Sequence, residues 1–145
     1  METIAVKKLR AGAKMPTFGS EEAAGADLYA CLDEEVTVAP GQTVFIPTGL
    51  AMALPKGYVG LVYARSGLAC KQDLAPANKV GVIDSDYRGE FMIALRNHGK
   101  ETRTVHHGDR VAQLVITPVL HPLYREEDSL DETARGTGGF GSTGT

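Results

Sequence analysis

The segment from Gly81 to Gly89 gathers two carboxylates, a tyrosine and an arginine between apolar stretches. Asp84 follows Val82 and Ile83, so its carboxylate is expected at the rim of a partly dry pocket. A carboxylate held at such a rim could act as a general base toward water. Asp, Ser and Gly also favour turns, so a polar hairpin turn without catalytic work is the alternative interpretation.

A second polar group, Ala64-Arg65-Ser66-Gly67, lies between a predicted strand and a predicted helix. An arginine, a hydroxyl and free backbone N–H groups at such a junction could bind phosphate. The alternative is an ordinary strand end with a capping serine. The G-x-S-x-G spacing of a nucleophile elbow is absent, so Ser66 is not expected to act as a nucleophile.

Two further polar features are ambiguous when taken alone. Gln113 lies in a predicted strand, where a lone glutamine is usually a surface residue or a satisfied polar group of the core. The pair His106 and His107 could suggest a metal, but adjacent strand residues face opposite ways, so no metal site is expected there.

Residues 135–145 differ in kind from the domain of residues 1–134. They carry five glycines and no apolar periodicity, so a mobile C-terminal tail is expected. The run Arg135-Gly-Thr-Gly-Gly-Phe-Gly-Ser142 is similar to a phosphate-cradling loop, but it lacks the lysine of a P-loop. A plain flexible tail is the alternative, although such a tail has no need of Phe140 near a guanidinium.

Short segments rich in Val, Ile, Thr and Tyr must position these groups, and turn signals such as Pro40-Gly41 separate them. Evenly spaced short strands without a helical pattern between them predict an all-β sandwich or barrel. One short helix is expected around Gly67–Asp73. The predicted strands include Val36–Val38, Thr43–Ile46, Tyr58–Tyr63, Phe91–Leu95 and Val111–Val115.

The predicted strand Phe91–Leu95 is apolar on both faces. Phe91, Ile93 and Leu95 alternate on one face, and Met92 and Ala94 form the other. We therefore expect this strand to be buried on both sides.

The composition bounds the class of protein. A chain of 145 residues with 43% apolar residues suits a single domain with a continuous core. A net charge of -3, from 15 basic and 18 acidic residues, argues against a dedicated nucleic-acid binder. It leaves room for a small anionic substrate, because a few local arginines suffice to bind phosphate.

Cysteine usage and hydropathy indicate the compartment. Cys31 and Cys70 stand in no metal-ligand or redox spacing, which favours free thiols in a reducing cytosol. The N-terminus lacks the apolar stretch of a signal peptide, and no apolar run approaches the ~20 residues of a membrane helix. A soluble, cytoplasmic protein with no membrane partner is expected.

In combination these segments resemble the trimeric dUTPase family over nearly the whole chain. Five ordered motifs spanning about 120 residues make the match specific. They are Ala24-Gly-Ala-Asp-Leu28, Ala64-Arg-Ser-Gly-Leu-Ala69, Asn78 through Gly89, Gly108-Asp-Arg-Val-Ala-Gln-Leu114, and Arg135 through Gly144.

The resemblance implies a jelly-roll-like (β-clip) domain that assembles as a homotrimer with active sites shared between subunits. The tail of one subunit would close as a lid over a site formed by others. The implied reaction is Mg²⁺-assisted hydrolysis of dUTP to dUMP and pyrophosphate, by in-line attack of water on the α-phosphorus. Such an activity limits uracil in DNA and supplies dUMP for dTMP synthesis.

The same resemblance assigns roles to residues that would contact the nucleoside. Asp84 would act on the attacking water and contact the sugar 3′-hydroxyl. Tyr87 would pack under the deoxyribose and leave no room for a 2′-hydroxyl. Uracil would be read by main-chain groups of the Asn78–Ile83 hairpin, which includes Gly81 and Val82, in a slot too tight for the methyl group of thymine. Asn78 would add a side-chain contact.

Other matched residues would surround the phosphates. Arg65, Ser66 and Gly67 match the phosphate-binding segment, and Gln113 matches a contact to phosphate and water. Phe140 would stack on uracil. Magnesium would be held by the phosphates and water, with Asp27 supporting its water shell and no direct protein ligand. The γ-phosphate clamp would comprise Arg135, Ser142 and backbone N–H groups of Gly138, Gly139 and Gly141.

Three rival interpretations stay open. dCTP deaminase, an enzyme of related fold, carries a second serine after Arg-Ser and a glutamate for deamination; here Gly67 follows Ser66 and Asp84 occupies the later motif. A binding protein that uses the dUTP site as a regulatory switch is the second. A plain structural trimer is the third, and the intact Asp84, Tyr87 and tail argue against it. The stretch Cys70–Ala77 has no assigned chemistry, and Asp86 and Arg88 are interpreted as loop or interface residues.

Overall fold

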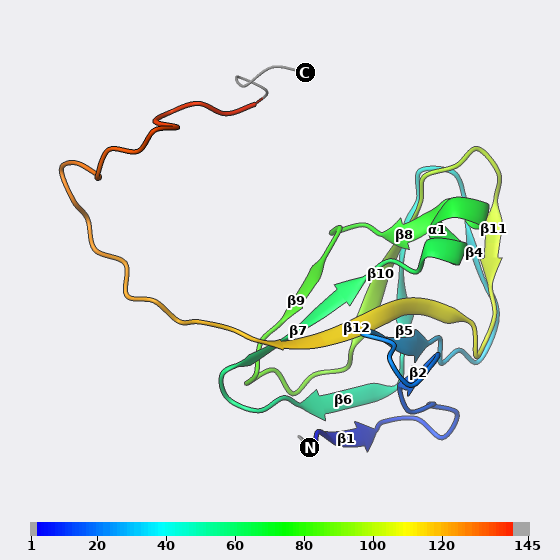
Figure 1. Ribbon diagram of the computed structural model, residues 1–145. Helices are drawn as coiled ribbons and strands as arrows, with labels where there is room; N and C mark the ends of the chain where they lie inside the picture. The colour runs from blue at the N-terminus through cyan, green and yellow to red at the C-terminus, as the bar shows by residue number, and fades with distance from the viewer. Residues whose placement is uncertain (1–2, 141–145) are drawn as a thin grey trace.

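A computed structural model describes residues 3–140, which form short β-strands joined by tight turns, with one short helix in that range (Figure 1). The all-β class with one short helix is therefore confirmed. In chain order the elements are β1 (Ala5–Lys8), β2 (Thr17–Phe18), β3 (Ala26–Tyr29), β4 (Val36–Val38), β5 (Thr43–Pro47), β6 (Leu50–Ala53), β7 (Tyr58–Tyr63), α1 (Ser66–Gln72), β8 (Leu74–Pro76), β9 (Gly81–Ile83), β10 (Met92–Asn97), β11 (Arg103–Val105) and β12 (Arg110–Pro118).

Two sheets supply most of the core. One is five-stranded, in the order β2-β3-β12-β7-β9, and the other is three-stranded, in the order β5-β10-β8. Their strand pairs are antiparallel, which lets one face of each sheet bury apolar side chains. Leu28 of β3 and Leu114 of β12 belong to one apolar cluster with Ile46 of β5 and Leu95 of β10. The paired strands β1-β6 and β4-β11 add Leu50, Val38 and Val105 to the same cluster.

The predicted elements agree closely with the observed ones. β4 and β7 have the predicted bounds, β5 extends to Pro47, and β12 is longer at both ends. The helix begins at Ser66 and ends at Gln72, one residue before its predicted start and end, and the left-handed residue Asp73, whose φ is 57°, is its C-cap.

The prediction that the strand Phe91–Leu95 is buried on both faces is wrong for the single chain. Ile93 and Leu95 are buried, but Met92 on the opposite face is 41% exposed and Ala94 is partly exposed. No second layer of this chain covers that face in the described residues, and Met92 and Ala94 line a pocket instead.

The chain leaves the β-domain after β12. The backbone N–H of Val119 still donates to the carbonyl of Gly57 at 2.9 Å, and beyond it the chain runs outward (Figure 1). The large apolar side chains of this outward segment are exposed, namely Leu120, Leu123, Tyr124, Leu130 and Phe140. A domain boundary at residue 135 stays a prediction, and Gly141 and Ser142 lie outside the described residues.

The two cysteines and the lengths of the helices bear on the predicted free thiols and on the predicted lack of a membrane span. Cys31 is buried and Cys70 is exposed, and both are free thiols. The described part of the chain contains no helix with the length and hydropathy of a membrane span.

Candidate active site

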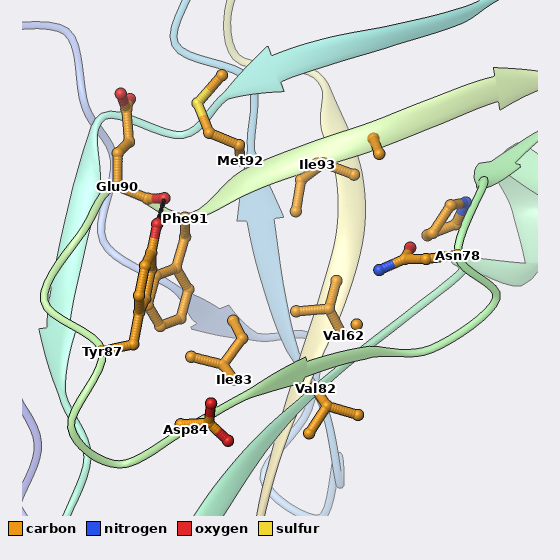
Figure 2. Close-up of a pocket in the computed structure, with 13 residues that line it drawn as sticks. Val62, Asn78, Val82, Ile83, Asp84, Tyr87, Glu90, Phe91, Met92 and Ile93 are labelled. Carbon is orange, nitrogen blue, oxygen red and sulfur yellow. Dashed lines mark hydrogen bonds between the residues drawn. The ribbon is translucent and has the colours of Figure 1, made fainter.

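The β9 hairpin and the start of β10 enclose a pocket of about 240 Å³, here called the hairpin pocket (Figure 2). It brings together the residues of the Asn78–Gly89 motif that the resemblance placed near the base, the sugar and the attacking water, whereas Phe140 and Gln113 do not line it. Those residues are Asn78, Gly81, Val82, Ile83, Asp84 and Tyr87. The remaining walls are mostly apolar, with Val62, Pro76, Glu90, Phe91, Met92, Ile93 and Ala94.

The edge position of β9 gives this pocket unpaired backbone groups. β9 is the outer strand of the five-stranded sheet and pairs with β7 along one side only. The other side of an edge strand presents backbone N–H and C=O groups to a partner. Gly81 packs tightly against β7, because a β-carbon there would lie 3.2 Å from Cβ of Val62. The hairpin thus offers a narrow slot whose polar groups are mainly backbone.

Asp84 and Tyr87 follow the hairpin on the same loop. Figure 2 shows the Asp84 carboxylate near Ile83, and Asp84 is exposed. The Tyr87 ring packs beside Phe91, with 6.2 Å between ring centroids, and is still 44% exposed. Its hydroxyl donates a hydrogen bond to the Glu90 carbonyl at 2.9 Å. An oriented aromatic surface therefore lies beside an accessible carboxylate.

A second polar cluster is built on β3, β12 and the start of α1. The Nε atom of Arg65 donates to Oδ1 of Asp27 at 2.6 Å, and Nη1 of Arg110 lies 3.3 Å from Oδ2 of the same carboxylate. Asp27 is only 9% exposed, so the two arginines satisfy a buried charge. Two guanidinium groups around one carboxylate leave an excess of positive charge, which suits the binding of phosphate.

Arg65, Gly67 and Arg110 line a pocket of about 330 Å³, here called the arginine pocket. Lys71 of α1 adds a further cation to its walls. The remaining lining residues are Leu68, Gln72, Thr104, Val105, Asp109 and Val111. Three cationic side chains and one carboxylate, that of Asp109, give this pocket an excess of positive charge that suits an anionic group.

Ser66 is not a capping residue. Arg65 occupies the N-cap position of α1, and no side-chain hydrogen bond caps the helix. The alternative of an ordinary capping serine is therefore wrong, and Ser66 is the first residue of the helix beside the arginine pocket.

Gln113 lies directly opposite Asp27 in the pairing of β12 with β3. Its Nε2 donates to the Ala64 carbonyl at 2.8 Å, so its amide group is tied to the segment that leads into Arg65. Gly25 leaves room for this side chain, since a β-carbon on Gly25 would lie 2.7 Å from Oε1 of Gln113. The interpretation of Gln113 as a polar residue with a hydrogen-bond partner thus holds for the NH₂ group of its side-chain amide.

A β-bulge places Arg110 and Gln113 on one face of the sheet. Arg110 pairs with Tyr29 and Gln113 with Asp27, and the register shifts between Arg110 and Ala112. Residues three apart on a regular strand face opposite sides, whereas one extra residue restores the same side. Val111 and Ala112 are accordingly buried in succession. Sequence reasoning did not single out Arg110, because regular alternation would have turned it away from Gln113.

One chain does not unite the two pockets. The hairpin pocket and the arginine pocket have no lining residue in common. The tail residues Arg135, Gly138, Gly139 and Phe140 lie away from the β-domain (Figure 1), and Nε of Arg135 donates to the Gly138 carbonyl at 2.9 Å. The predicted site residues therefore form separate groups within the single chain.

The carboxylate and imidazole groups were the candidates for direct metal ligands. No group of three or more His, Cys, Asp or Glu residues suited to hold a metal ion occurs among residues 3–140. Asp27 has both carboxylate oxygens engaged by arginines, although its side chain keeps 13% exposure. His106 is exposed, with its Nε2 atom 3.3 Å from Oε2 of Glu35 and its Nδ1 atom 3.6 Å from Oδ2 of Asp109.

Comparison with known proteins gives one consistent family. The dUTPase family model matches residues 11–144. The deoxyuridine 5'-triphosphate nucleotidohydrolase of Desulfitobacterium hafniense is 58% identical over 132 residues, which cover 90% of this chain and 87% of the relative.

Solved structures agree with the sequence match. The Staphylococcus bacteriophage 80alpha dUTPase, solved with dUpNHpp, superposes with a TM-score of 0.92 at 28% identity and full coverage of both chains. The dUTPase of phage phi11 of S. aureus, described with a structural Mg(II) ion, gives a TM-score of 0.81 at 28% identity, covering 88% of this chain and 98% of that one. With a family model over most of its length and a close relative over nine-tenths of it, this chain belongs to the dUTPase family.

Proposed function

We propose that this protein hydrolyses dUTP to dUMP and pyrophosphate. The observation that carries the proposal is the hairpin pocket, in which an accessible carboxylate, an oriented tyrosine and an edge strand meet. The structural neighbour solved with dUpNHpp, a dUTP analogue, supports the same substrate class.

Base recognition follows from the edge strand. Uracil would enter the slot along Gly81, Val82 and Ile83 and exchange hydrogen bonds with their backbone groups. Asn78, whose Nδ2 would lie 3.4 Å from a β-carbon on Gly81, stands close enough to add a side-chain contact. Backbone groups held by the pairing of β9 with β7 cannot retreat from an added methyl group, which accounts for rejection of thymine.

The chemical step depends on Asp84. Its carboxylate would accept a proton from the water that attacks the α-phosphorus in line, and pyrophosphate would leave on the opposite side. Phosphoryl transfer requires positioning and charge neutralisation more than covalent chemistry. Arg65, Ser66, Gly67 and Gln113 would hold the phosphates for this step.

The tail would complete the phosphate site. Arg135 would pair with the γ-phosphate together with Ser142 and the backbone N–H groups of Gly138, Gly139 and Gly141, and Phe140 would stack on uracil. The exposure of Phe140 and the outward course of the chain after β12 (Figure 1) fit a segment whose binding partner is not its own domain.

We infer that the protein acts as a homotrimer with shared sites. Three observations support this arrangement: the two pockets have separate walls, Met92 at the hairpin pocket is exposed, and the tail leaves its own domain. A hairpin pocket of one subunit facing the arginine pocket of the next would unite base, sugar and phosphate contacts.

Magnesium fits this arrangement as an ion held by the substrate. The described residues offer no direct ligand cluster, and Asp27 retains some exposure for a water-mediated contact. The ion would neutralise charge on the phosphates. Within the protein, Asp27 would orient the surrounding water while keeping Arg65 and Arg110 in place.

Such an activity would limit the incorporation of uracil into DNA and supply dUMP, and a reducing cytosol would suit the two free thiols. The direct test is pyrophosphate release from dUTP against dTTP, dCTP and UTP in the presence of Mg²⁺. Release from dUTP alone supports the proposal. Ammonia released from dCTP would replace it with a deaminase activity.

A further inference from the structure

The ring of Tyr87 folds back over the main chain of Gly89. A β-carbon on Gly89 would lie 2.4 Å from Oη of Tyr87, 2.5 Å from Cζ and 2.9 Å from Cε2. Gly89 is not among the glycines with positive φ, so its backbone conformation would accept alanine. Glycine is therefore needed at this position for space, and the residue that uses the space is Tyr87.

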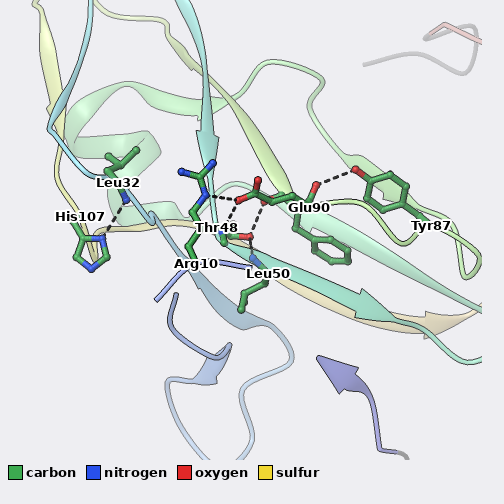
Figure 3. A network of polar contacts seen from close by, with 9 residues as sticks. Arg10, Leu32, Thr48, Leu50, Tyr87, Glu90 and His107 are labelled. Carbon is green, nitrogen blue, oxygen red and sulfur yellow. Dashed lines mark hydrogen bonds and ion pairs between the residues drawn. The ribbon is translucent and has the colours of Figure 1, made fainter. Parts of the chain in front are cut away.

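The far end of the ring is fixed as well. The hydroxyl of Tyr87 donates to the Glu90 carbonyl at 2.9 Å (Figure 2). The carboxylate of Glu90 accepts the backbone N–H of Gly49 at 2.8 Å and lies 3.4 Å from Nε of Arg10 (Figure 3). The carbonyl that receives the tyrosine hydroxyl thus belongs to a residue anchored to the turn before β6 and to the N-terminal segment.

A ring selects against a sugar hydroxyl by bulk only when it cannot move aside. Tyr87 is held by the bare main chain of Gly89 beneath it, by Phe91 beside it and by Glu90 at its hydroxyl. We propose that Gly89 is a specificity-determining residue of this site, because it lets the Tyr87 ring lie where a ribose 2′-hydroxyl would have to be. This inference rests on the proposed function of the hairpin pocket.

The substitution Gly89→Ala tests the inference. The atoms that the new methyl group meets belong to the end of a side chain, so the ring should move while the domain stays folded. We expect the ratio of kcat/KM for dUTP to kcat/KM for UTP to fall by about tenfold. The thermal melting curve should show a folded protein.

Gly19→Ala is the matched control. Gly19 also lacks positive φ, and a β-carbon there meets nothing within 4 Å. It makes the same chemical change without touching the hairpin pocket. Its dUTP to UTP ratio should stay within about twofold of the wild-type value.

A double-mutant cycle separates ring displacement from a general structural effect. In a Tyr87→Ala background the methyl group has no ring to displace, so Gly89→Ala should change the ratio no further. An equal fall in that background, or an unchanged ratio in the single variant, would overturn the inference.

A second variant covers the case in which Gly89→Ala does not fold. In that case the double variant Tyr87→Ala/Gly89→Ala should fold, because the ring that the new methyl group meets is gone. A double variant that also fails to fold would overturn the inference. A wild-type protein that releases no pyrophosphate from dUTP overturns the proposed function and this inference together, whereas an active wild type with an unaltered Gly89→Ala ratio overturns this inference alone.

Discussion

The Nε atom of Arg65 lies 2.6 Å from Oδ1 of Asp27, a residue that is only 9% exposed. This ion pair joins the segment before α1 to strand β3 of the five-stranded sheet. It fixes the direction of the guanidinium that the proposed function assigns to phosphate. The fold and the candidate phosphate site therefore depend on the same contact.

Asp27→Asn should lower both stability and turnover. The amide cannot satisfy two guanidinium groups, and losing hydrogen bonds to a charged partner costs about 1.5–3 kcal/mol of unfolding free energy. Urea denaturation and steady-state hydrolysis of dUTP measure the two effects. Asp33→Asn, at an exposed aspartate, serves as control. Equal stability in the two variants would show that the ion pair is not structural.

Asp84→Asn should reduce kcat for dUTP by about 10²–10⁴-fold, because the isosteric amide cannot accept a proton from water. Binding of dUTP, measured by calorimetry, should stay close to the wild-type value. Asp86→Asn changes a nearby exposed carboxylate of the same loop and should keep most of the activity. Comparable activity in both variants would remove Asp84 from its proposed role.

Shared sites predict complementation between two inactive chains. Asp84→Asn removes the proposed base from the hairpin pocket, and Arg65→Ala removes a cation from the arginine pocket. Mixed trimers formed by co-expression should recover up to about a quarter of wild-type activity, since some sites combine the intact halves of different subunits. Sites built within one chain would give no recovery.

Deleting residues 135–145 should abolish hydrolysis and leave the domain folded. The described part of this tail contributes no residue to the buried core, so the melting temperature should change little. Deleting only residues 143–145 keeps all of the proposed tail contacts and should preserve activity. An active long truncation would contradict the lid, and an unfolded one would contradict the predicted independence of the domain.

Periodicity and turn residues were sufficient to predict the class and most strand positions. β4 and β7 are bounded by turn signals and rich in β-branched or aromatic residues, and their bounds match the prediction. The strand Phe91–Leu95 was misjudged because apolar composition does not reveal what covers a face. Met92 faces a pocket in the single chain, and composition alone cannot distinguish a pocket wall from a core layer.

The hairpin pocket was also foreseeable, because its polar residues are close in sequence and a tight hairpin brings them together. The arginine pocket depends on contacts between distant segments. The side chain of Arg110 reaches Asp27 across 83 positions of the chain. Glu90 is similar, since its carboxylate meets Gly49 and Arg10 only after the sheets have formed. Neither contact leaves a periodic or compositional signal.

Because of the β-bulge in β12, the number of residues between Arg110 and Gln113 matters as much as which residues they are. Deleting Val111 would leave Arg110 and Gln113 two positions apart on one face, but it would remove a side chain that is only 1% exposed and so open a void in the core. An inserted residue would enlarge the bulge or break the pairing of Arg110 with Tyr29. During evolution this stretch should accept substitutions at its apolar positions more readily than any gain or loss of a single codon.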